Sequence, residues 1–95
     1  MKANVDRWLA QLGGAPLSLE DIESLPRVPV LGKLAVLVRA EGDYTGMRGD
    51  KIPDAVLLGT ICELDSELVF VKMLGPKAEV EPRADEFVAF CRALR

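Results

Sequence analysis

The sequence predicts an α+β fold, in which an antiparallel sheet of three main strands carries helices in the order α-α-β-β-β-α. Near the N-terminus, apolar residues recur at the spacing of one helix face. Three apolar runs of strand length then lie between residues 33 and 74, separated by turn-forming residues. A second helical stripe closes the chain. The first stripe consists of Val5, Trp8, Leu9 and Leu12, and the last of Val80, Ala84, Phe87, Val88, Cys91 and Leu94.

The helix boundaries follow from residues that begin or end helices. The first helix is predicted over 3–12, because Gly13-Gly14 supplies a left-handed termination. A short helix is predicted over 19–25, with Ser18 as N-cap, Asp21 completing a capping box and Pro26 ending it. In the last helix the continuous part should start near Pro82, after a looser turn.

The three strands are predicted over 33–40, 55–64 and 67–74. The middle of the first run is apolar without alternation, so we expect this strand to be covered on both faces. The last helix can cover one face, and the first helix either covers part of the other or reaches across to a second chain. The second and third strands should pair antiparallel through a turn at Asp65-Ser66. Residues 42–54 contain three glycines, three aspartates and a proline, and are predicted to form one long, mobile loop.

Length and composition restrict the class of protein. The 95 residues fit a single domain over 1–95, and 49% of them are apolar, so some apolar surface should remain exposed. The net charge of −3, without a basic cluster, argues against a nucleic-acid partner. No run reaches the length of a membrane-spanning helix, and the N-terminus has no signal-peptide pattern. These observations favour a cytoplasmic chain with reduced cysteines.

The residues offer little catalytic chemistry. The chain has no histidine, and both cysteines, Cys62 and Cys91, lie in apolar surroundings. The aspartates of 42–54 do not have the spacing of a calcium loop, and its glycines do not form a phosphate loop. We therefore predict no catalytic residue, cofactor or metal site, and a non-catalytic interaction or small-ligand-binding domain. The alternative is a small enzyme without histidine chemistry that uses 42–54 as a lid. In either case the ligand-contacting side chains of this loop would be Tyr44, Arg48 and Asp50.

Both ends of the chain resemble a known group of proteins. The N-terminal stretch, residues 4–13, reads Asn-Val-Asp-Arg-Trp-Leu-Ala-Gln-Leu-Gly, and residues 70–76 read Phe-Val-Lys-Met-Leu-Gly-Pro, followed by Phe87, Phe90 and a final Arg-Ala-Leu-Arg. These segments resemble an uncharacterised bacterial family, planctomycete-type and often lipoprotein-like. The resemblance implies half of a PsbP-like α/β sandwich and no known activity. Family members carry extra N-terminal strands, so this chain would be an excised piece, with an exported parent, or a half-length version.

The strand pattern predicts a homodimer. Alternate residues of a strand face opposite sides, and both faces of the second and third strands are largely apolar. Such a sheet, without the extra strands, makes a poor monomer, and a second copy related by a two-fold axis would cover it. We expect an interface above about 1,000 Å². Its predicted residues are Trp8, Leu12, Leu68 and Phe70.

Overall fold

The computed structural model describes residues 1–46 and 48–94. Helix α1 spans Lys2–Gln11 and the short α2 spans Leu19–Glu23. Four strands follow, and a short helical turn, a 3₁₀ turn and a final helix close the chain. The strands are β1 (Arg27–Val30), β2 (Lys33–Thr45), β3 (Lys51–Leu64) and β4 (Glu67–Pro76); the closing elements are α3 (Lys77–Val80), η1 (Glu81–Arg83) and α4 (Ala84–Ala93).

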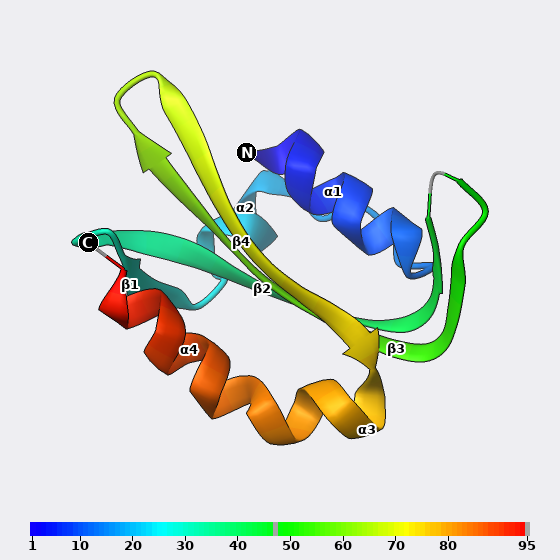
Figure 1. Cartoon of the computed structure of the whole chain (residues 1–95). Helices are drawn as coiled ribbons and strands as arrows, with labels where there is room; N and C mark the ends of the chain where they lie inside the picture. The colour runs from blue at the N-terminus through cyan, green and yellow to red at the C-terminus, as the bar shows by residue number, and fades with distance from the viewer. Residues whose placement is uncertain (47, 95) are drawn as a thin grey trace.

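The sheet is an antiparallel meander in the order β1-β2-β3-β4 (Figure 1). The predicted α+β class is confirmed, but the expectation of three main strands is wrong, because β1 adds a fourth. The sequence pattern does not reveal β1, because this strand is short and contains Pro29, which has no amide hydrogen to donate. Proline is tolerated there because β1 is an edge strand. A two-residue turn, Leu31-Gly32, joins β1 to β2, and both residues have positive φ.

Helices cover both faces of the sheet, so β2 is covered on both sides, as its unbroken apolar run predicted. Figure 1 shows α1 on one face and α3 with α4 on the other. Successive side chains of a strand point to opposite faces of the sheet. Each of the two resulting cores therefore contains alternate residues of the strands. The α1-side core is formed by Val5, Trp8, Leu12, Val36, Val38, Ala40, Ala55, Leu57 and Ile61. The α4-side core is formed by Val28, Val30, Ala35, Val56, Leu58, Cys62, Val80, Phe87 and Cys91.

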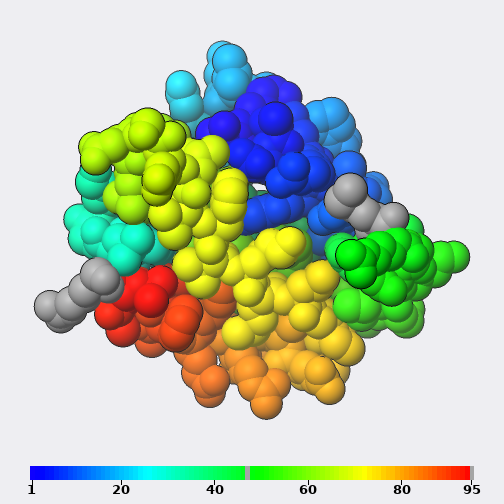
Figure 2. Space-filling view, turned by 45° about the horizontal axis from the view of Figure 1, so that its top comes forward, coloured from blue at the N-terminus to red at the C-terminus, as the bar shows by residue number. Residues whose placement is uncertain are grey.

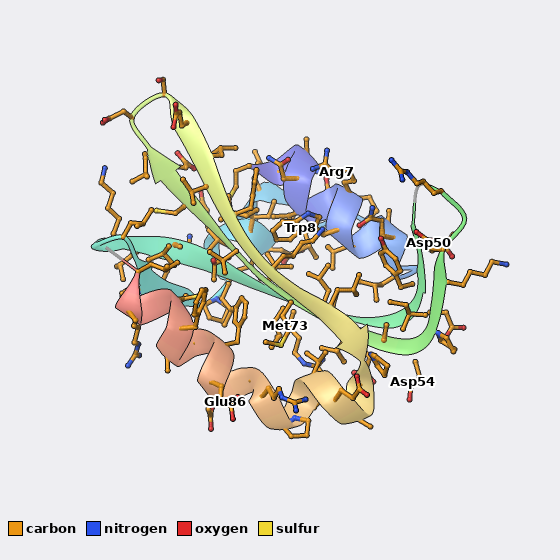
Figure 3. The ribbon with its side chains drawn as sticks, in the orientation of Figure 1. Arg7, Trp8, Asp50, Asp54, Met73 and Glu86 are labelled. Atoms are coloured by element: carbon orange, nitrogen blue, oxygen red, sulfur yellow. The ribbon has the colours of Figure 1, made fainter. Side chains whose placement is uncertain are left out.

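Trp8 attaches α1 to the sheet. Its side chain is buried between the helix and the strands (Figure 3), with its six-membered ring directly over Gly59 of β3. Phe70 of β4 meets the indole edge-on, with ring centroids 5.8 Å apart and planes inclined by 67°. The ammonium of Lys72 lies 5.5 Å from the indole centroid, within the range of a cation–π interaction. The indole is therefore enclosed by three residues from two strands.

The region predicted as a long loop is mostly strand, so that prediction is wrong. β2 continues to Thr45 and β3 begins at Lys51, which makes 42–54 a long hairpin. The strand pairing in this hairpin is irregular at its glycines and aspartates. The register shifts between Gly42 and Tyr44, and the amide of Asp54 donates to Oδ1 of Asp43 at 2.9 Å. Gly42 has φ +152°, and a Cβ there would overlap the carbonyl oxygen of Leu12 at the end of α1.

The predicted helix boundaries hold closely. The capping box of α2 is present, with the amide of Asp21 donating to Oγ of Ser18, although α2 ends at Glu23. The continuous last helix starts at Ala84, after the looser turns that contain Pro82. Asp6 of α1 accepts hydrogen bonds from Lys2 and from the backbone amide of Leu17. These bonds lower the pKa of the Asp6 carboxyl and tie the connection after α1 to the helix.

We expect Gly59→Ala to destabilise the fold by about 1–3 kcal/mol, because the new methyl group would overlap the indole of Trp8. The free energy of unfolding from urea titration measures this effect. In a Trp8→Phe background the same substitution should cost clearly less, since phenylalanine lacks the ring carbons that the methyl would meet. An equal cost in both backgrounds would show that Trp8 is not what restricts position 59.

We also expect Phe87→Ala to cost about 3–5 kcal/mol, because the ring is buried in the α4-side core. Phe90, one turn further along the same helix, is the matched control, since its side chain is 57% exposed. Phe90→Ala should lower the free energy of unfolding by clearly less than Phe87→Ala does. A similar loss for both variants would mean that α4 packs on the sheet by another face.

Candidate functional site

The two edges of the sheet differ in how much unpaired backbone they expose. β1 is four residues long, carries Pro29, and packs through Val28 and Val30 into the α4-side core. β4 is ten residues long and pairs only with β3 among the described strands. Proline occurs in β4 only at its last position, Pro76. β4 is thus the edge at which a further strand can add to the sheet.

Alternate residues of β4 turn their backbone groups toward this free edge. Leu64 and Glu67 flank the two-residue turn between β3 and β4, and such a flanking pair is hydrogen-bonded. Because bonded and non-bonded pairs alternate along an antiparallel ladder, the next pair is non-bonded, and so on. By this alternation Pro76 falls at a non-bonded position, which suits a residue without an amide hydrogen. The outward-facing backbone groups belong to Leu68, Phe70, Lys72 and Leu74.

Exposed apolar side chains flank this edge on both faces. On the side of α1, Leu68 is 37% exposed and Phe70 43%. On the side of α4, exposed Phe90 stands beside a shallow groove of about 470 Å³ lined by β4 and α4. Figure 2 shows β4, in yellow, at the centre of this face, with α1 in blue on one side and α4 in orange and red on the other. We call this combined surface of β4 and Phe90 the β4 edge.

The four residues predicted at an interface fall in two different places. Trp8 and Leu12 are buried in the α1-side core of the same chain, so the structure does not place them at a surface open to a partner. Their helix covers the sheet face that the sequence left unassigned. Leu68 and Phe70 lie at the β4 edge. Phe90 was missed because it lies beside the apolar stripe of α4, and its only sequence signal was an aromatic ring next to that stripe.

The predicted ligand residues Tyr44, Arg48 and Asp50 do not line one site. Tyr44 is a half-buried residue of β2 that packs against the α1-side core. Arg48 and Asp50 are exposed at the hairpin turn, and neither lines the shallow hollow of about 410 Å³ beside Tyr44 and Ile52. Strand pairing between residues 42–45 and 51–55 holds the two arms of the hairpin, and the predicted lid stays a prediction.

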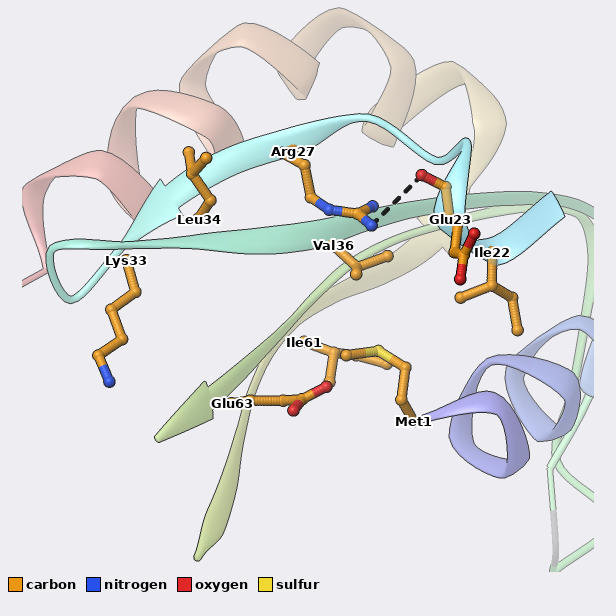
Figure 4. Close-up of a pocket in the computed structure, with 9 residues that line it drawn as sticks. All are labelled: Met1, Ile22, Glu23, Arg27, Lys33, Leu34, Val36, Ile61 and Glu63. Carbon is orange, nitrogen blue, oxygen red and sulfur yellow. Dashed lines mark hydrogen bonds between the residues drawn. The ribbon is translucent and has the colours of Figure 1, made fainter. Parts of the chain in front are cut away.

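A second hollow lies at the other end of the α1 face, next to α2 (Figure 4). This cleft of about 400 Å³ has Val36 and Ile61 in its floor and four charged side chains around it, two cationic and two anionic. The guanidinium of Arg27 already donates to the backbone carbonyls of Leu25 at 2.8 Å and Glu23 at 3.4 Å. The cleft therefore offers two cations and two carboxylates, and one of the cations is already bonded to backbone carbonyls. Its charged residues are Glu23, Arg27, Lys33 and Glu63.

The charged groups near the start of α3 have a structural role. Glu41 of β2 accepts a hydrogen bond from Lys77 of α3 at 2.6 Å and another from Arg39 at 3.1 Å. Arg39 also pairs with Glu81, so these four residues connect the sheet to the turns before α4. The two cations lower the pKa of the Glu41 carboxyl. All four are exposed or partly exposed ion-pair partners, and none lines the three hollows described in this subsection.

The two cysteines are free and buried in the α4-side core. The Cys91 thiol lies 3.9 Å from Oγ1 of Thr60, and burial raises its pKa. A thiol that is buried and hard to ionise is a poor nucleophile. Over residues 1–46 and 48–94, no group of three or more Cys, Asp or Glu side chains is arranged to hold a metal ion. Within the same ranges, no helix is both long and apolar enough to cross a membrane.

Comparison with known proteins assigns no relative. No family model, curated protein or solved structure matches the chain. The resemblance of the chain ends to the planctomycete-type family, and with it the PsbP-like sandwich, stays a prediction. The site must therefore be interpreted from its own geometry.

We expect two free thiols per chain in the unfolded, unreduced protein. In the native protein, reaction with a thiol reagent at pH 8 should be slow, because both sulfur atoms are inaccessible to it and burial raises the pKa of Cys91. A colorimetric thiol assay with and without urea makes the comparison. Immediate reaction of the native protein would contradict the buried positions, and a count of zero in urea would show that the cysteines are oxidised.

Proposed function

We propose that this chain is a non-catalytic interaction domain that acts as a homodimer, with the β4 edge as its contact surface. The observation that carries the proposal is the contrast between the two edges of one sheet. β1 is short and contains a proline, whereas β4 is ten residues long, turns the backbone groups of alternate residues outward and has apolar side chains on both faces. A long apolar edge strand favours pairing with another strand.

The composition of the edge supports a second copy as the partner. Apart from Glu67 at its start, Lys72 is the one charged residue of β4, so two such strands can meet with little charge to desolvate. A two-fold axis is the commonest symmetry of soluble homo-oligomers, and it lets one exposed surface cover itself. The edge also lies between two helical layers, which leaves it open in the plane of the sheet (Figure 2).

The enzyme alternative has less support. Its predicted lid is a paired hairpin, and its predicted ligand residues do not converge. The cleft beside α2 remains the place where a small molecule could bind, but its only polar groups are exposed charges of both signs. An interaction domain accounts for the exposed apolar side chains of the β4 edge, and a small-molecule site in the cleft does not.

We expect the protein at micromolar concentration to sediment as a species of twice the 10.4 kDa chain mass. Leu68→Lys should raise the dissociation constant at least about tenfold, a change of about 1.4 kcal/mol, because it places a charge at each end of a two-fold apolar contact. Sedimentation velocity over a concentration series measures both quantities.

Leu34→Lys is the matched control for this experiment. Leu34 is also an exposed strand leucine on the α1 face, at 71% exposure, but it lies at the start of β2, away from the β4 edge. This variant should dimerise like the parent. A parent protein that stays monomeric would overturn the homodimer, and equal effects of the two substitutions would overturn the assignment to the β4 edge.

A further inference from the structure

Resting on the proposed homodimer, we infer that two β4 strands pair antiparallel in one register, with the two-fold axis passing beside Val71. The two sheets then form one continuous sheet of eight strands. Each Lys72 lies opposite the partner's Phe70, and each Leu68 opposite the partner's Leu74. This register follows from backbone parity, from the extent of β4 and from the position of its single internal charge.

The alternation of outward-facing backbone groups along β4 allows only a few registers between the two β4 strands. Only residues whose amide and carbonyl groups face outward can hydrogen-bond across the new edge, and in β4 these alternate along the strand. An antiparallel pairing must place outward residues opposite outward residues. Around a two-fold axis this requires the axis to pass beside a single residue of β4. The candidates near the middle of the strand are Phe70, Val71 and Lys72.

The length of β4 and its charge then select Val71. An axis at Val71 or at Lys72 pairs nearly the whole of Glu67–Pro76, whereas an axis at Phe70 leaves the C-terminal end unpaired. An axis at Lys72 places two ammonium groups directly opposite each other, which destabilises a strand pair. It also sets Pro76 opposite Leu68, where proline has no amide to donate. The Val71 axis avoids both costs and pairs all four outward residues, through about eight backbone hydrogen bonds.

The side chains are complementary in this register on both faces. On the α1 side, the cation of Lys72 adds to the partner's Phe70, while it also lies over its own Trp8. On the α4 side, Val71 meets its own counterpart and Val69 meets Met73. The partner's side chains on this face enter the groove that Val71, Met73 and Phe90 line. The register therefore covers the apolar surface on both sides of the edge.

Disulfide trapping between engineered cysteines tests the register. Val71→Cys places the two new cysteines, one from each chain, in a non-hydrogen-bonded pair. Their Cα atoms are then about 4.5 Å apart, a separation that a disulfide can bridge. In the same register, Phe70→Cys and Lys72→Cys place like residues diagonally, about 7–8 Å apart, beyond the usual range. Air oxidation with a copper–phenanthroline catalyst and non-reducing gels give the rates. The parent, with both cysteines buried, gives the background.

We expect Val71→Cys to form covalent dimer at least tenfold faster than the other two variants, with far-UV circular dichroism showing that all three are folded. Fastest trapping of Phe70→Cys or Lys72→Cys would overturn this register while leaving an edge-to-edge dimer. A dimeric parent with no trapping at any of the three positions would overturn edge pairing itself. A monomeric parent would instead overturn the proposed function on which the register rests.

Discussion

The contact between Trp8 and Gly59 organises one half of this structure. A glycine in a central strand leaves a gap in the apolar surface, and the indole fills it. The same ring meets two side chains of β4, so a single residue of α1 holds the helix to both a central and an edge strand. These contacts lie on the α1 side of Phe70 and Lys72, the same two residues whose backbone groups face outward at the β4 edge.

The sequence predicted the elements whose signals are local. The stripe of Val5, Trp8 and Leu12 and the capping box at Ser18 each identify a helix from neighbouring residues alone. The hairpin over 42–54 could not be recognised in the same way. Its pairing depends on a bulge at which Pro53 and Asp54 of β3 oppose the single residue Asp43 of β2. The close approach of Leu12 that requires Gly42 comes from a different part of the chain. Because the contact that requires this glycine is long-range, the glycine looks in the sequence like a residue of a loop.

Strand parity predicted half of the candidate site. It correctly placed Leu68 and Phe70 on one face of a largely apolar strand, but it could not say how far a helix would cover that face. Trp8 and Leu12 are in the core because α1 lies on its own sheet, a matter of tertiary packing that the helical stripe leaves open. The exposure of Phe90 likewise depends on how α4 is rotated about its axis over the strands. A residue beside an apolar stripe can face either the sheet or the solvent.

The short β1 strand has a consequence for how many copies can join. A sheet that is open at both ends can add molecules without limit, which is how edge strands lead to fibres. Here the β1 end of the sheet is only four residues long, and Pro29 has no amide hydrogen to donate there. In the proposed homodimer, growth through β4 would therefore stop after one addition. The difference between the two edges would make such an assembly finite.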